Sequence, residues 1–103
     1  MTNGSNEVSG TTYFDKPVLN IEKASNSSVR LKWELVEGVK YYEIYRKSSK
    51  TSYKKLKTIK TNEYISKALK VQEVYYFKIR GYKEVDGIKV FSPYSSAKAY
   101  RMK

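Results

Sequence analysis

An apolar or aromatic residue stands at nearly every second position of "VYYFKIRGY", residues 74–82, and this alternation limits what the chain can fold into. Tyr75, Phe77 and Ile79 share one parity, and the opposite parity carries two tyrosines and two cations. Successive side chains of a strand point to opposite faces of a sheet. The segment is therefore predicted to be a strand with one face in a core and the other directed outward.

Other short segments alternate in the same way and are separated by turn-forming residues. In "VRLKWE", Val29, Leu31 and Trp33 point inward, and in "YYEIYRK" Tyr42 and Ile44 share one parity. No segment has a convincing helical period. About seven strands with turns every ~8–12 residues are typical of an antiparallel β-sandwich, so we expect an all-β fold.

Asp86-Gly87 is the strongest hairpin signal, because a type I′ turn requires positive φ at both central residues. The flanking Val85, Ile88 and Val90 are unusually apolar for a hairpin tip. Two interpretations are open. Either the tip protrudes and carries contacts, or the hairpin folds over the end of the sandwich and covers its core, which is the interpretation we favour.

Composition argues against enzymatic chemistry. The chain has neither cysteine nor histidine, which excludes zinc fingers, disulfides and Cys or His nucleophile–base pairs, and no metal or cofactor is predicted. Glu22, Glu34, Glu43 and Glu84 all have outward parity. Nothing brings two carboxyls together at the ~5–10 Å that a glycosidase pair needs. We therefore predict no active site.

The net charge of +11 attracts anionic partners such as acidic polysaccharides, wall polymers or nucleic acid. Seventeen of the 21 cations are lysines, which weakens the nucleic-acid interpretation because bidentate recognition prefers arginine. No apolar run approaches the ~20 residues that span a bilayer, so no membrane insertion is expected.

Residues 1–15 are predicted to form a flexible leader or linker, and residues 16–103 a single domain. The first ten residues, "MTNGSNEVSG", lack the apolar region of a signal peptide. Their polar composition suggests a module from a longer protein.

The pattern from Lys16 to about Tyr100 resembles a fibronectin type III domain. In the first pattern, a proline near the start is followed by apolar residues that lead to an inward tryptophan. In the second pattern, a leucine lies six residues before a tyrosine, and that tyrosine opens an alternating strand that ends in a small residue. Here the second pattern is Leu69, Tyr75, Phe77, Ile79 and Gly81. Together with the alternation, the resemblance implies a core formed by Leu19, Ile21, Val29, Leu31, Trp33, Tyr42, Ile44, Leu69, Tyr75, Phe77 and Ile79.

The resemblance also implies that the Tyr75 hydroxyl returns to upstream backbone as a tyrosine corner. Two positions depart from the family. Gly81 replaces the usual alanine and indicates a bulge or close backbone approach, and Val71-Gln72 replaces Pro-Gly, so that turn is expected to differ. Arg80-Gly81 is followed by Tyr82, so integrin-type binding through Arg-Gly-Asp is not supported.

The sequence looks most like bacterial members of this family, which occur as repeats in secreted or wall-attached carbohydrate-active enzymes and adhesins. The resemblance therefore implies an extracellular or cell-wall-associated setting. We expect a non-catalytic, monomeric module that contacts neighbouring domains as a spacer or interaction domain. The alternative is weak binding of an anionic glycan or cell-wall polymer through one exposed sheet face, formed by Tyr45, Tyr76, Lys78, Arg80 and Tyr82. The simpler interpretation is that tyrosines favour strands and that lysines on edge strands, such as Lys54, Lys55 and Lys57, block aggregation.

Overall fold

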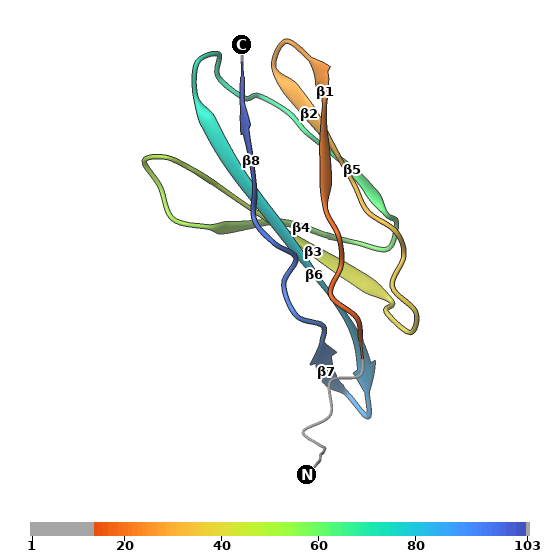
Figure 1. Cartoon of the computed structure of the whole chain (residues 1–103). Coiled ribbons are helices and arrows are strands. Elements are labelled where there is room, and N and C mark those ends of the chain that lie inside the picture. The colour runs from red at the N-terminus through yellow and green to blue at the C-terminus, as the bar shows by residue number, and fades with distance from the viewer. Residues whose placement is uncertain (1–13, 103) are drawn as a thin grey trace.

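The computed structural model describes residues 14–102, and residues 1–13 of the predicted leader lie outside the described part. Two antiparallel sheets face each other (Figure 1). One has the strand order β1-β2-β5. The other has the order β4-β3-β6-β7, with β8 also pairing to β6. The strands are β1 Asn20–Ser25, β2 Ser28–Lys32, β3 Tyr41–Ser48, β4 Lys54–Ile59, β5 Glu63–Ser66, β6 Val74–Val85, β7 Ile88–Phe91 and β8 Lys98–Arg101.

The predicted sandwich is confirmed, with eight strands rather than about seven. The extra strand arises because the final strand divides into β7 and β8, both of which pair with β6. Pro93, which cannot donate a ladder hydrogen bond, lies in the irregular segment 92–97. The hydroxyls of Ser92 and Ser95 accept hydrogen bonds there from the backbone N–H of Gly81 (2.8 Å) and Ile79 (3.0 Å).

The core lies between the sheets and contains the predicted residues. Ten of the eleven are buried; Ile21 is only partly buried and packs against the others. Burying such side chains stabilises a domain by roughly 1.5–3 kcal/mol each. Met102, which the alternation did not indicate, is also in the core with 1% of its surface exposed.

The tyrosine corner is present. The Tyr75 hydroxyl accepts a hydrogen bond of 2.9 Å from the Lys70 backbone N–H. The turn before it contains two non-glycine residues with positive φ, Ala68 (61°) and Gln72 (73°). The Gln72 N–H donates to the carbonyl of Met102 at 2.7 Å, which ties this turn to the end of β8.

The described chain begins at one end of the sandwich and ends at the other (Figure 1). Phe14 is buried, and its ring lies against Gly38 and below the Lys83 ammonium, close to the β6–β7 end. Met102 pairs with Glu73, just before β6 begins. The twelve residues of β6 separate these two ends by roughly 35 Å.

Candidate functional site

Strands β3 and β6 are adjacent and antiparallel, which places the predicted sheet face on neighbouring rows. The register pairs Tyr45 with Lys78 and Lys47 with Tyr76. Glu43 pairs with Arg80 on the same parity. The five residues Tyr45, Tyr76, Lys78, Arg80 and Tyr82 therefore do share the outer face of this sheet, which we call the tyrosine–cation face.

Glu43 is at the centre of this face and is almost completely covered. It was expected to point outward, and it does leave the core side, but only 2% of its surface is exposed. Its Oε1 accepts hydrogen bonds from Arg80 Nε and the Tyr45 hydroxyl, both at 2.8 Å. Lys55 Nζ lies 3.5 Å from Oε2. Neighbouring strands thus enclose the carboxylate with two cations and a hydroxyl.

The contacts around Glu43 determine the protonation of the group. Burial alone would raise the pKa of the carboxyl, but the hydrogen bonds from Arg80 and Tyr45 and the nearby positive charges outweigh it, so the pKa is lowered. Burial and the hydrogen bond to Glu43 raise the pKa of Tyr45. At neutral pH the site is therefore an ionised carboxylate beside a neutral tyrosine.

The two predicted cations of β6 are packed against aromatic rings. The Arg80 guanidinium carbon is 3.8 Å from the ring centroid of Phe91 and 4.7 Å from that of Tyr94. Lys78 Nζ lies 4.1 Å from the Tyr94 centroid and 4.3 Å from that of Tyr53. Such cation–π contacts are worth ~0.5–1 kcal/mol each at exposed sites. Both cations already have partners within the domain.

Tyr82 does not belong to an exposed surface, and that part of the prediction is wrong. Only 6% of Tyr82 is exposed, because its ring stacks on Tyr41 at 5.0 Å and packs against Phe91 at 5.4 Å. Lys89 Nζ lies 4.8 Å from the ring centroid. Parity gave the correct side of the sheet, but cross-strand aromatic neighbours cover the ring. The other four predicted residues are partly exposed.

Three aromatic residues of the face were not indicated by the sequence. Tyr94 comes from the irregular segment 92–97 and meets Tyr45 edge-on at 5.5 Å. Tyr53, in the loop before β4, and Phe91, at the end of β7, complete the stacks. Neither Tyr53 nor Tyr94 lies in a strand, so no period-two signal could have found them.

The Asp86-Gly87 turn is confirmed, with φ of 53° and 80° and Val85 paired with Ile88. The expectation that the hairpin covers the core is wrong. Val85 is 44% exposed and Ile88 68% exposed, so the tip protrudes. The β6–β7 turn lies at the end of the sandwich where the described chain begins (Figure 1).

Strand β4 forms one edge of its sheet. Lys54, Lys55 and Lys57 are all exposed along it, as the edge-protection interpretation requires. Among residues 14–102, no group of acids, cysteines or histidines could hold a metal ion. No helix of the described chain is long and apolar enough to cross a membrane.

Comparison with known proteins gives no match to a protein-family model or to a curated protein. Solved structures do match. A mutant of the protein FN3tt is 26% identical, with a TM-score of 0.72 over 86% of this chain and 96% of its own. The sixth fibronectin type III domain of human fibronectin type III domain containing protein 3 is 18% identical, with a TM-score of 0.73 over 91% of this chain and 90% of its own.

A third similar structure is a much larger protein. The β-1,2-glucanase from Parabacteroides distasonis is 24% identical, with a TM-score of 0.70 over 88% of this chain but only 13% of its own. The fold is therefore that of a fibronectin type III-like β-sandwich, and a domain of this fold is also found within longer proteins.

Proposed function

We propose that the chain is a non-catalytic, monomeric fibronectin type III-like module that acts as a spacer or protein-interaction domain in a larger secreted or cell-surface bacterial protein. The observation that carries the proposal is the separation of the described ends by the length of β6. A domain with this geometry holds whatever precedes it and whatever follows it about 35 Å apart.

The tyrosine–cation face supports the spacer more than the alternative of an anionic-glycan site. Arg80 is held by Glu43 and by two aromatic rings, and Lys78 lies between two rings. A ligand would have to displace these contacts before it could use either charge. Similarity to a domain-sized part of a glucanase supports a carbohydrate-associated parent protein.

Spin labels test the spacer directly, because the chain contains no cysteine that would compete for them. Cysteines introduced at the exposed Asp15 and Arg101 would report the distance between the two ends by pulsed electron resonance. We expect one narrow distribution, unchanged when the domain stands within its full-length protein. A broad or context-dependent distribution would contradict a rigid spacer. The full-length gene should also encode a secretion signal and further domains.

The alternative is tested by NMR titration with an acidic polysaccharide and with single-stranded DNA, at low and at physiological salt. For the tyrosine–cation face, the spacer predicts no chemical-shift changes beyond the diffuse ones at lysines that disappear as salt screens the net charge. Shifts confined to Tyr45, Tyr76, Lys78 and Arg80 that survive physiological salt would replace the spacer with a binding module. Lys78→Gln would then abolish them, while Lys98→Gln, an exposed lysine of β8, serves as the charge-matched control.

A further inference from the structure

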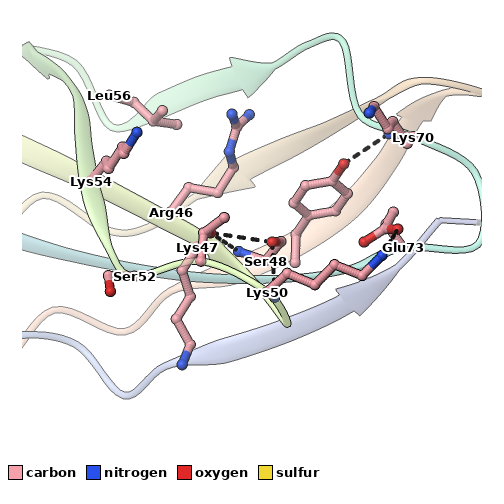
Figure 2. A pocket seen from close by; sticks show the side chains of 11 residues that line it. Arg46, Lys47, Ser48, Lys50, Ser52, Lys54, Leu56, Lys70 and Glu73 are labelled. Carbon is pink, nitrogen blue, oxygen red and sulfur yellow. Dashed lines mark hydrogen bonds and ion pairs between the residues drawn. The ribbon is translucent and has the colours of Figure 1, made fainter.

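A second cationic region lies at the C-terminal end of β3, next to Tyr76, and none of the five residues of the tyrosine–cation face lines it. There the loop between β3 and β4 approaches the turn before β6, and the two border an open hollow of about 390 Å³ (Figure 2). This volume is within the range of ~300–1,000 Å³ that is typical of small-molecule sites. We call the region the end hollow.

The end hollow has an excess of positive charge. Arg46, Lys50, Lys54 and Lys70 line it, with Glu73 as the one carboxylate among the lining residues. Glu73 is already engaged, because Lys50 Nζ lies 3.7 Å from its Oε2. Lys47 also borders the region, but its ammonium lies over the rings of Tyr53 and Tyr76 and extends away from Arg46 (Figure 2).

The wall of the end hollow is held in place by contacts that do not use the ammonium groups of Lys54 and Lys70. Arg46 Nη1 donates to the Ser66 hydroxyl at 3.0 Å, and its guanidinium lies 5.6 Å from the Tyr75 ring centroid. The Lys70 backbone is fixed by the bond to the Tyr75 hydroxyl. Lys54 and Lys70 are exposed, and neither is in an ion pair within the described residues. Because the wall behind the two lysines is already fixed, an anion would have to order only the lysine side chains when it binds.

The lining also indicates what kind of anion would fit. Ser48, Thr51 and Ser52 add hydroxyl groups beside the cations. The one aromatic residue of the lining, Tyr75, is only 8% exposed, so it offers no ring face on which a nucleobase could stack. Cations with hydroxyls suit a charged oxyanion carried on a polyhydroxylated chain better than they suit single-stranded nucleic acid.

We propose that the end hollow binds a sulfate or phosphate group carried on a polysaccharide, with Lys54 and Lys70 as its ammonium donors and Arg46 as a fixed guanidinium behind them. The site goes beyond the spacer role and uses neither Lys78 nor Arg80. Binding here would attach the module to an anionic glycan, and it would leave the distance between the ends of the domain unchanged.

The test compares two pairs of lysine substitutions that change the net charge equally. Lys54→Gln with Lys70→Gln removes the proposed donors. Lys57→Gln with Lys67→Gln removes exposed lysines from the same strand and the same turn that do not line the hollow. All four side chains are exposed, so both variants are expected to fold, and their NMR spectra verify this directly.

The probes are a sulfated oligosaccharide, its unsulfated parent, inorganic sulfate, inorganic phosphate and a thymidine oligonucleotide, each at physiological salt. We expect saturable shifts in residues 46–54 and 67–75 with the sulfated oligosaccharide and none with its parent. The site pair should weaken binding about fivefold or more, as expected for two partly exposed charge contacts, and the control pair should change it by less than about twofold. Binding of inorganic sulfate and phosphate at the same residues, more weakly than the sulfated oligosaccharide, would show that the charged group itself is recognised.

Equal weakening by both pairs, or shifts spread over distant strands, would overturn the site and leave only attraction by net charge. Oligonucleotide binding as tight as that of the sulfated oligosaccharide would overturn the glycan assignment. Neither result affects the distance between the spin labels, so each of the two proposals, the spacer and the end hollow, can be contradicted while the other stands.

Discussion

Tyr75 and Tyr76 are consecutive residues of one chemical type, yet the fold uses them in different ways. Tyr75 is 8% exposed, with its hydroxyl bonded to the Lys70 backbone, whereas Tyr76 lies on the outer face beneath the Lys47 ammonium. Alternation was sufficient to predict this difference, because neighbouring strand residues point to opposite faces.

Removing the two hydroxyl groups should therefore have unequal effects. Tyr75→Phe leaves the Lys70 N–H without its acceptor, and we expect a loss of ~0.5–1.5 kcal/mol in the free energy of unfolding. Tyr76→Phe, the matched control, should change it by almost nothing. Urea melts measure both, and the reverse order would mean that the strand register is wrong by one residue.

Glu43 shows that the alternation of residues along a strand does not predict how deeply an outward-facing side chain is buried. The sequence gives the side of the sheet, but the burial of the carboxylate depends on Arg80, Lys55 and Tyr45 arriving from β6, β4 and β3. The same holds for Tyr82, which is covered by Tyr41 and Phe91. Cross-strand register decides exposure, and a single sequence does not contain that register.

Replacing Glu43 should make stability less dependent on pH. The folded state lowers the pKa of this carboxyl below the value of an unfolded chain, so the unfolded state binds the proton more readily. The resulting stabilisation is complete above the unfolded pKa of about 4.5 and is lost as pH falls through the lower folded value. Glu43→Gln should cost ~1–3 kcal/mol at pH 7, with the difference shrinking toward zero in acid.

Urea melts between pH 7 and pH 3 measure this effect, and Glu34→Gln, at an exposed glutamate, is the control. A pH profile of Glu43→Gln that runs parallel to the native one would show that the carboxylate is not held as described.

At the scale of elements, β6 depends on a close approach that only glycine allows. A Cβ at Gly81 would lie 2.5 Å from Val39 Cγ1 and 3.3 Å from Tyr42 Cε1. The sequence indicated either a bulge or a close approach at Gly81, and the structure shows the latter. Val39 packs against the core from the chain segment before β3, so the contact links that segment to β6.

Gly81→Ala should therefore destabilise the domain by ~1–3 kcal/mol through overpacking. Adding Val39→Ala should recover part of that loss, because it removes the two methyl groups nearest the new Cβ. A double-mutant cycle of thermal or urea unfolding measures the coupling. Additive losses in the double variant would refute the contact. Gly87→Ala is a useful comparison, since nothing lies within 4 Å of its Cβ and its cost arises from the φ of 80° alone.

For the whole molecule, the sequence was sufficient to predict two facing sheets and nearly all of the core. It did not predict the end hollow, because this forms where the loop between β3 and β4, with the strand ends beside it, meets the turn before β6, and no periodic pattern in the sequence records that meeting. It also failed at the β6–β7 tip, where apolar residues suggested burial although Ile88 is 68% exposed. Hydrophobicity indicates a core only where the topology places another layer opposite.

Trp33 tests whether the sandwich has one cooperative core. It is 2% exposed and lies 5.4 Å from the Tyr42 ring centroid, and its backbone N–H bonds to Asn62 at 3.1 Å. Trp33→Ala should cost ~3–5 kcal/mol, which is near the whole stability of a small domain. Circular dichroism during urea unfolding measures this, with Leu35→Ala, at a side chain that is 65% exposed, as the control. Native fluorescence resembling free tryptophan in water would contradict the burial.

The placement of the chain ends has a mechanical consequence. If the domain is pulled by its two ends, β1 is drawn along β2 and β8 is drawn along β6 in the opposite direction, since each pair is antiparallel and lies roughly along the line that joins the two ends. The load then falls on several ladder hydrogen bonds at once instead of opening them one after another. A single-molecule stretching experiment should therefore record one abrupt rupture at high force, and a protein containing many such modules would extend in discrete steps under tension.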